Sequence, residues 1–406
     1  MSCRRIQTIF ILGISSGLPL ALTSSSLQAW FTSEGVDLVT IGFLTLLGLP
    51  YVWKFLWAPV LDRFLPPFLS RRKGWILISQ AFLCLLILIM SRLSPSTQPS
   101  LISLVALSVA FMSATQDIGS DAYRADLLSP NERGMGAASA TLGFRVAMLI
   151  SGGLALIMAD HIGWKLTYEI MASLIGLSMI VTFFAPREPK CEYKPQKFIN
   201  FIVEPFYDLL SKDKILIIIL FIITYKLGDA LALSLMSNFL LNSLQFSLTD
   251  VGVAFKFFGL IATLLGVLVG GILMVRLSLF SSLMLFGLFQ AFSNITFVFL
   301  AMIGKNYCLM FSCIFIESFC SGMSTAAFVA FLMSLCNKKF SATQYAFLSA
   351  LFALSRVFSG PIAAVLVKNI GWINFYLIAF FLSFPGIFLL TALRGNVSVN
   401  YAKVNA

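Results

Sequence analysis

Residues 151–168 read SGGLALIMADHIGWKLTY and residues 359–376 read SGPIAAVLVKNIGWINFY, so one pattern occurs twice in the chain. A second pair, GLPLALT at 17–23 and GDALALS at 228–234, recurs at an offset of 211 residues. Chance similarity between Leu- and Gly-rich helices explains these nearly equal offsets less well than duplication of a half of the 406-residue chain does. The positions of the first copy that recur at an offset of 208 residues include Ser151, Gly152, Gly163, Trp164 and Tyr168.

The composition is that of a membrane protein. Hydrophobic residues make up 59% of the chain and charged residues 11%, and the mean hydropathy is +0.94. A soluble domain has roughly 45–50% apolar and about 25% charged residues, so soluble, disordered, coiled-coil and collagen-like classes are excluded. Strands of outer-membrane barrels alternate polar and apolar residues over about ten positions. Here the apolar runs continue for roughly 20 residues or more, which is the length of a spanning helix.

Polar residues divide the chain into twelve apolar segments. Arg4 and Arg5 precede the first segment, which is too long for the apolar region of a signal peptide and has no small-residue cleavage site. We therefore expect it to remain as a first transmembrane helix. The predicted segments are 6–32, 38–61, 75–93, 100–128, 136–160, 165–186, 214–241, 250–274, 279–302, 306–335, 343–368 and 371–394.

The basic residues predict the orientation of these segments. With the N-terminus in the cytoplasm, most of the 28 Lys and Arg residues fall in cytoplasmic loops, as the positive-inside rule requires. Both termini are then cytoplasmic, and the net charge of +11 faces anionic lipid, so we expect no nucleic-acid partner. The periplasmic side keeps four basic residues: Arg92, Lys165, Lys305 and Lys368.

The longest polar stretch, 187–213, predicts a cytoplasmic linker between two domains. Residues 1–186 would form an N-terminal six-helix bundle, and residues 214–406 a C-terminal six-helix bundle with a short cytoplasmic tail. Two parallel six-helix repeats are the architecture of the major facilitator superfamily. We therefore predict an all-α membrane protein with twelve transmembrane helices in two six-helix repeats of that fold.

Charges inside the apolar segments mark the candidate site, because each costs at least about 2.5–3.5 kcal/mol in hydrocarbon. Static ion pairs that fix helix register would explain a single pair of charges. Two balanced clusters, one in each half, favour a polar translocation cavity, and the two explanations are compatible. The first half holds Lys54, Asp117, Asp121, Arg124 and Arg145, and the second holds Lys226, Asp229, Glu317 and Arg356.

A proton-coupled transporter needs a group that gains and loses a proton, and the only histidine, His161, lies in a short periplasmic turn. A carboxylate must then serve. Asp121 can pair with Arg124 on its own helix, whereas the nearest partners of Asp117 lie on other helices and can move away from it. We rank Asp117 first and Asp121 second as the proton carrier, followed by Asp229 or Glu317.

Other chemistries lack their residues. The seven cysteines lie mostly in apolar runs without paired spacing, so neither a disulfide framework nor a metal site is expected. No Ser/His/Asp or Cys/His set lies in one layer, and no P-loop or dinucleotide fingerprint occurs, so we expect no enzyme and no cofactor. No repeated selectivity loop suggests a channel. Transport would then be facilitated or ion-coupled.

Four stretches resemble one family. They are SSGLPLALTSSSLQAW at 15–30, GLPYVWKFLWAPVLDRFLPPFLSRRKGW at 48–75, QDIGSDAYRADLLSPNERGMGAA at 116–138 and LGFRVAMLISGGLALIMAD at 142–160. Together they resemble the AmpG family of muropeptide permeases, a branch of the major facilitator superfamily. The resemblance covers most of the N-terminal half, while the second half matches a generic facilitator half. A set of residues also resembles the superfamily's gating loop, although its usual glycines are missing: Asp62, Arg63, Arg71, Arg72 and Lys73, with Arg124 nearby.

The resemblance implies import of anhydromuropeptides across the bacterial inner membrane, driven by the proton gradient. The import would feed peptidoglycan recycling, whose products signal β-lactamase induction in some bacteria and so bear on β-lactam resistance. We expect a monomer in the lipid bilayer. Alternatives are a permease for another bulky anion, such as acetyl-CoA or a peptide, and a non-transporting sensor on the same fold. Substrate carboxylates, amides and sugar rings would contact Lys54, Arg145, Lys226, Arg356, Gln116, Trp30, Tyr51, Trp53 and Tyr225.

Overall fold

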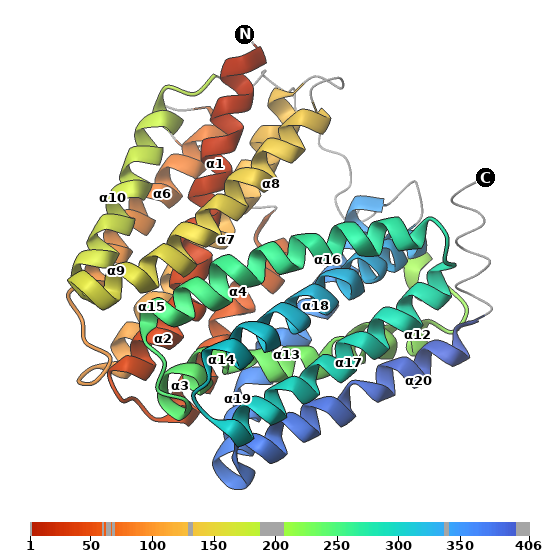
Figure 1. Ribbon diagram of the computed structural model, residues 1–406. Coiled ribbons are helices and arrows are strands. Elements are labelled where there is room, and N and C mark those ends of the chain that lie inside the picture. The colour runs from red at the N-terminus through yellow and green to blue at the C-terminus, as the bar shows by residue number, and fades with distance from the viewer. Residues whose placement is uncertain are drawn as a thin grey trace. The chain divides into compact units, whose positions relative to one another are not determined.

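The computed structural model describes residues 2–58, 61, 66, 70–128, 133–186, 207–336 and 341–394. Within these ranges every regular element is a helix (Figure 1). Ten helical stretches are long and apolar enough to cross a membrane, and Leu38–Trp53 is a shorter apolar helix. The stretch Phe347–Ala392 contains two passes, because Gly371 has φ 74° and breaks the helix there. The predicted all-α fold with twelve transmembrane helices is therefore confirmed.

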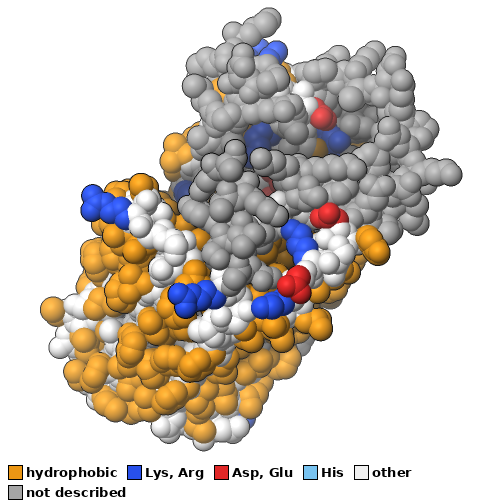
Figure 2. All heavy atoms as spheres, turned by 90° about the vertical axis from the view of Figure 1, so that its right-hand side faces the viewer, with side chains coloured by type: hydrophobic (Ala, Val, Ile, Leu, Met, Phe, Trp, Pro, Cys, Tyr) orange, Lys and Arg blue, Asp and Glu red, His pale blue; other side chains and the backbone are white. Residues whose placement is uncertain are grey.

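The apolar surface is the expected one for a membrane protein. Figure 2 shows hydrophobic side chains gathered over a broad area, with Lys and Arg in a band along one edge of it. On α16 (Gly259–Met274), the large side chains of Ile261, Leu268 and Ile272 are more than half exposed, at 57%, 63% and 68%. Since exposure of such side chains to water is unfavourable, these positions suit contact with lipid.

The N-terminal compact unit comprises Met1–Glu192 together with Leu240–Lys256. Its first pass is broken after Leu22, where the hydroxyls of Thr23 and Ser24 donate back to the carbonyls of Pro19 and Leu20. Its elements are α1 (Ser2–Leu22), α2 (Ser25–Ser33), α3 (Leu38–Phe43), η1 (Leu44–Gly48), α4 (Leu49–Trp53), η2 (Lys54–Leu56), α6 (Arg71–Met90), α7 (Pro99–Leu127), α8 (Arg133–Leu149), η4 (Ile150–Leu154), α9 (Ala155–Ile162) and α10 (Trp164–Phe183).

Helices α1 and α8 are in direct backbone contact in this unit. A Cβ atom at Gly13 would overlap the backbone carbonyl of Ala140, and one at Gly143 would overlap that of Phe10. Small residues of this kind let transmembrane helices approach closely, and dispersion forces then hold them together. The glycines near the start of the chain are therefore explained by packing.

Residues 240–256 pack on the end of α9. Helix α15 (Leu248–Val251) begins with Ser247, which forms a reciprocal capping box with Asp250. Asp160 accepts hydrogen bonds from the backbone nitrogen and the hydroxyl of Thr249, at 3.2 and 2.5 Å. The first part of the eighth predicted segment thus belongs to the N-terminal compact unit, and π-helix η6 (Gly252–Phe258) continues it.

The C-terminal compact unit comprises Tyr193–Phe239 and Phe257–Ala406. Its core is rich in aromatic residues, among them Phe221, Phe286, Phe328 and Phe331, which are at most 2% exposed. Its elements are α12 (Ile215–Thr224), α13 (Leu227–Ser234), α14 (Met236–Asn238), α16 (Gly259–Met274), α17 (Leu279–Ile303), α18 (Tyr307–Leu335), α19 (Ser341–Leu382) and α20 (Phe384–Ala392). The boundary between the two units falls within π-helix η5 (Phe239–Ser243), after Phe239.

Aromatic packing repeats between the two halves. In the first half, Trp30 stacks on Trp164 with ring centroids 5.7 Å apart and contacts the tilted ring of Tyr168 at 4.8 Å. In the second half, Phe239 contacts Trp372 at 4.9 Å and Tyr376 at 5.1 Å. In each half, the Trp and Tyr side chains of the duplicated Gly-Trp…Tyr sequence thus pack against an aromatic ring from the first transmembrane segment of that half.

The predicted domain boundaries remain predictions. Most of the proposed linker, 187–206, lies outside the described residues, and so do both chain ends. The cytoplasmic position of the termini is likewise still an expectation from the charge distribution.

Candidate functional site

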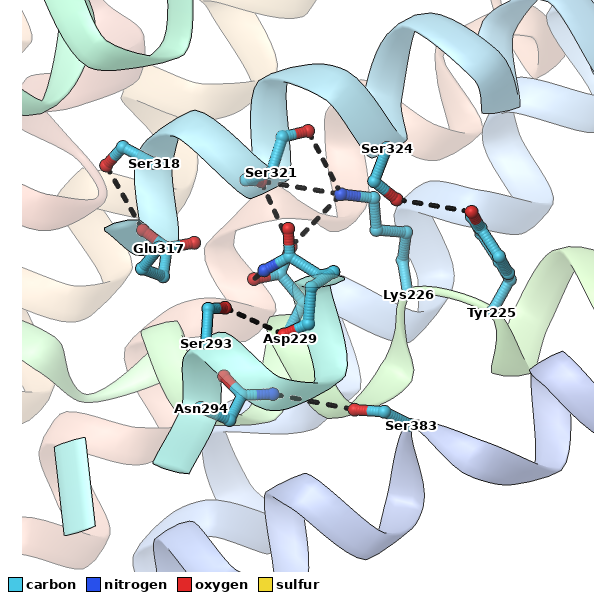
Figure 3. Close-up of polar contacts among 11 residues, drawn as sticks. Tyr225, Lys226, Asp229, Ser293, Asn294, Glu317, Ser318, Ser321, Ser324 and Ser383 are labelled. Carbon is cyan, nitrogen blue, oxygen red and sulfur yellow. Dashed lines mark hydrogen bonds and ion pairs between the residues drawn. The ribbon is translucent and has the colours of Figure 1, made fainter. Parts of the chain in front are cut away.

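A buried cluster of charged and polar side chains lies in the C-terminal unit (Figure 3). Lys226 lies at the break between α12 and α13, where its φ of −109° and ψ of 11° are not helical. Its Nζ atom is 3.4 Å from Oδ2 of Asp229, as the spacing of three residues predicts, and the two side chains are only 3% and 12% exposed. Lys226 also donates to the carbonyl and hydroxyl oxygens of Ser321 on α18, at 3.3 and 3.4 Å.

Asp229 is the centre of this cluster. Its Oδ1 atom accepts a 2.8 Å hydrogen bond from Nε2 of Gln290 on α17, and its Oδ2 atom accepts one from the Ser321 hydroxyl at 3.3 Å. The carboxylate therefore holds together α13, α17 and α18. Hydrogen bonds to a charged group are about twice as strong as neutral ones, so these contacts define the geometry of the cluster well.

Glu317 lies on α18 one turn before Ser321 and is 2% exposed. Its Oε2 atom accepts a 3.1 Å hydrogen bond from Ser318, and Oε1 has no hydrogen-bond partner among the described residues. The charged groups that act on it are Asp229 and Lys226. The sequence-predicted second-half charges Lys226, Asp229 and Glu317 are thus brought together.

Two further members of the cluster, Gln290 and Asn294, were not among the predicted site residues. They are one turn apart on α17, and both are at most 3% exposed. The amide oxygens of both lack partners in the described part of the chain, while Nδ2 of Asn294 contacts the Ser383 hydroxyl at 3.5 Å. The sequence could have indicated these two residues by their i,i+4 spacing in an otherwise apolar segment, because uncharged amides are also unfavourable in hydrocarbon.

The N-terminal unit has a corresponding cluster without charges. Ser15 on α1 accepts hydrogen bonds from Nε2 of Gln80 on α6 at 3.0 Å and from Nε2 of Gln116 on α7 at 2.9 Å. The hydroxyl of Ser178 on α10 completes it, 3.1 Å from Ser15. Gln116, a predicted substrate contact, is fully buried here, so in this conformation its amide bonds within the bundle.

The charges of the N-terminal unit lie outside that cluster. Lys54, at the start of η2, is 3.8 Å from Oδ2 of Asp117 on α7, and the two side chains are 35% and 17% exposed. Of the two partners expected for Asp117, the structure therefore selects Lys54. Tyr51 lies half-buried within the field of the same carboxylate.

Asp121 and Arg124 form the predicted i,i+3 ion pair on α7. Nη2 of Arg124 is 3.0 Å from Oδ1 of Asp121, and the side chains are 33% and 59% exposed. The pairing is confirmed, and its geometry is that of a surface pair on one helix. The roles predicted for these residues in gating and proton coupling remain predictions.

Arg145 on α8 and Arg356 on α19 are exposed and make no ion pair with any residue that the structure describes. They are 211 positions apart, the same offset as in the repeat at 17–23 and 228–234. Both lie within candidate membrane spans. An arginine that faced lipid there would be costly, so this exposure indicates a polar, water-accessible surface.

The predicted loop-motif residues that the structure describes connect helices within the N-terminal unit. Nε of Arg72 is 3.2 Å from Oδ2 of Asp126, which ties the start of α6 to the end of α7. Lys73 donates to the carbonyl of Ala185 at 3.1 Å, just after α10. Arg71 begins α6, but its side chain lies outside the described part, as do Asp62 and Arg63 entirely.

The four predicted aromatic contacts differ in accessibility. Trp53 is 44% exposed and can reach a ligand in this conformation, whereas Tyr51 is half-buried and its hydroxyl is buried. Trp30 is 3% exposed within its aromatic cluster. Tyr225 is 4% exposed, stacks on Phe328 and donates to the carbonyl of Leu283 at 2.8 Å. In this conformation Trp30 and Tyr225 contribute to packing.

Among the residues described, no three His, Cys, Asp or Glu side chains lie close enough to hold a metal ion. The arrangement consists of fixed charges inside spanning helices, and exposed arginines at equivalent positions of the two halves. An exposed guanidinium can bind an anion, and a carboxyl group within a spanning helix can take up and release a proton. Fold and site together define a secondary transporter with two homologous halves.

Comparisons with known proteins narrow this class. The profile of the Major Facilitator Superfamily matches residues 9–346. The chain is 46% identical over 402 residues to the anhydromuropeptide permease of Escherichia coli K12, covering 99% of this chain and 82% of the relative. It is 33% identical over 408 residues to the Rickettsia conorii protein named "Putative transporter AmpG 4", covering 97% of this chain and 98% of that relative. The crystal structure of the nucleoside transporter NupG has the same fold, with a TM-score of 0.74 at 16% identity over 96% of this chain and 98% of that one.

The chain therefore belongs to the AmpG family of the major facilitator superfamily. The resemblance noted in the N-terminal half extends through the second half as well. The relatives are permeases and transporters, so this protein is a transporter and not an enzyme.

Proposed function

We propose that the protein imports anhydromuropeptides from the periplasm into the cytoplasm for peptidoglycan recycling. The observation that carries this proposal is the 46% identity to the anhydromuropeptide permease of E. coli K12 over 99% of the chain. The matched 402 residues include both halves of the chain. The protein would act as a monomer in the bacterial inner membrane, with both termini in the cytoplasm.

The exposed groups of the site suit such a ligand. Anhydromuropeptides combine sugar rings and amides with the carboxylates of the peptide stem. Arg145 and Arg356 are exposed and unpaired among the described residues, and a guanidinium binds a carboxylate through two parallel hydrogen bonds. Trp53 is exposed and can stack on a sugar ring. The next residue, Lys54, is paired with Asp117, but its side chain remains 35% exposed.

Energy would come from the proton gradient, by alternating access of the site to the two sides of the membrane. The sequence-predicted carriers remain Asp117, Asp121, Asp229 and Glu317. The contacts of Arg72 and of Arg124 with aspartates at the end of α7 are candidates for bonds that change when the transporter opens to the cytoplasm.

The test is uptake of radiolabelled GlcNAc-anhydroMurNAc-tripeptide into energised membrane vesicles that contain the protein. We expect accumulation that unlabelled ligand competes away and that acetyl-CoA and free peptide do not. Competition by acetyl-CoA or peptide alone would instead support a permease for another bulky anion. Binding without counterflow exchange in proteoliposomes would support a sensor and overturn the transport proposal.

A further inference from the structure

The buried cluster of the C-terminal unit contains an unbalanced set of charges. Asp229 and Glu317 are two carboxyl groups, and Lys226 is the one cationic group that acts on Glu317 among the described residues. Lys226 bonds to Asp229, so its charge is already compensated. A second buried carboxylate without a partner is strongly unfavourable, and a bound proton removes that charge.

Hydrogen bonding in the cluster points the same way. Within this cluster, three buried oxygen atoms have no donor among the described residues: Oε1 of Glu317, Oε1 of Gln290 and Oδ1 of Asn294. Every one of them is an acceptor, so the cluster has an excess of acceptors over donors. A protonated carboxyl group supplies one additional O–H donor, which an ionised one cannot. Asp229 interacts with Glu317 through its side chain and can receive that hydrogen bond.

The surroundings of Glu317 can change when the helices move. Lys226 acts on it from the break between α12 and α13, and Asp229 acts on it from the first turn of α13. Among described residues, the neighbouring helices α16, α17 and α19 contribute no charged group that acts on it. Lys226, the cation that acts on Glu317, lies at the non-helical break between α12 and α13, which can serve as a hinge. Displacement of that hinge relative to α18 would change how far Lys226 compensates Glu317.

We propose that Glu317 binds the coupling proton of this transporter, with Lys226 and Asp229 as its switching partners. The proposal rests on the transport function proposed above. When Lys226 bonds to Asp229, as in this structure, Glu317 holds the proton. When the hinge brings Lys226 to Glu317, the proton leaves. The Lys54–Asp117 pair is less suited to this task, because its charges are balanced one to one and both side chains are partly exposed.

The experiment uses the full chain in proteoliposomes, with the membrane potential set to zero and a pH gradient of one unit imposed. Such a gradient is a tenfold ratio of proton activity. With the membrane potential at zero, symport of one proton can therefore concentrate the ligand up to about tenfold, whatever its charge. We expect Glu317→Gln to lose this accumulation completely while it still exchanges labelled for unlabelled GlcNAc-anhydroMurNAc-tripeptide. Glu34→Gln, the same change at an exposed glutamate, is the matched control and should accumulate as the wild type does.

Failure of the two proposals can be told apart. If the wild type neither accumulates nor exchanges the ligand, the proposed function is wrong. If the wild type accumulates it and folded Glu317→Gln does so too, Glu317 is not the proton site. If Asp117→Asn loses accumulation while Glu317→Gln retains it, Asp117 and not Glu317 is the residue that binds the coupling proton.

A second variant covers the case in which Glu317→Gln does not fold. Glu317→Asp keeps an ionisable group but shortens the side chain by one methylene, so accumulation should persist with a shifted dependence on pH. An unchanged pH dependence in Glu317→Asp would overturn the proposal.

Discussion

The two halves of the molecule build polar clusters from the same helices but fill them differently. In each half a glutamine on the third pass donates its Nε2 atom to a group on the first pass: Gln80 to Ser15, and Gln290 to Asp229. The N-terminal cluster contains only hydroxyls and amides. The C-terminal cluster contains Lys226, Asp229 and Glu317, and its charges are almost completely buried.

The N-terminal charges are accessible instead. Lys54 and Asp121 are 35% and 59% exposed as side chains, against 3% for Lys226. Duplication has thus preserved the position of the polar cluster, while its content of charge has diverged. We interpret this as a division of labour, in which accessible charges bind the ligand and buried ones bind the proton.

The largest effect should come from Lys226→Met. This change leaves Asp229 and Glu317 in a buried site without a cation, and removing one partner of a buried pair costs about 3–5 kcal/mol. We expect loss of most folded protein, measured by size-exclusion chromatography and thermal unfolding in detergent. Lys54→Met is the matched control in the more exposed pair, where about 1 kcal/mol or less is expected.

The double variant Lys226→Met/Asp229→Asn sharpens this prediction. It removes one cation and one anion, so much of the lost stability should return. Equal destabilisation by Lys226→Met and Lys54→Met would show that burial does not distinguish the two halves.

Helix geometry explains which parts of the site the sequence could predict. Asp121–Arg124 and Lys226–Asp229 are each three residues apart, so local geometry alone brings the partners together. The apolar segments and the break at Gly371 were also visible in the sequence. Their predicted ends agree with the observed helices to within a few residues, while the end of the second segment falls among residues that mostly lie outside the described part of the chain.

Contacts between helices were harder to predict from the sequence, because they depend on how each helix is rotated about its axis. The sequence left Asp117 with two possible partners, and only the structure selects Lys54. It did not place Gln290 beside Asp229, since an uncharged amide gives a weaker signal than a charge. The sequence also did not predict that Trp30 is buried, because its neighbours Trp164 and Tyr168 lie on other helices, more than a hundred residues away along the chain.

The second prediction concerns the equivalent arginines of the two halves. Arg145→Ala and Arg356→Ala should each weaken ligand binding by about 1.5–3 kcal/mol, the range of a hydrogen bond to a charged group. The apparent KM for uptake would rise by roughly tenfold to a hundredfold. Arg→Lys at each position should restore only part of the loss, since lysine lacks the planar fork. An unchanged KM in one alanine variant, at normal protein level, would restrict anion binding to the other half.

The third prediction compares the glutamines. Gln290→Leu removes a hydrogen bond to a carboxylate, worth about 1.5–3 kcal/mol, whereas Gln80→Leu removes bonds to neutral hydroxyls, each worth about 0.5–1.5 kcal/mol. Thermal unfolding should show the larger loss for Gln290→Leu. If Gln80→Leu were the more destabilising change, the N-terminal cluster would be the stronger of the two despite its lack of charge.

The smallest effect is expected at the surface pair of Asp121 and Arg124. Both side chains are at least one-third exposed, and exposed pairs contribute about 0.2–1 kcal/mol. A double-mutant cycle with Asp121→Asn and Arg124→Gln should therefore give a coupling energy in that range at low salt. At about 1 M salt the Debye length falls to about 3 Å, so the coupling should largely disappear. A coupling that exceeds 1 kcal/mol and persists at high salt would mean that the pair is shielded from solvent in the dominant state. That result would move Asp121 into the buried class of charges and end the distinction between the two halves.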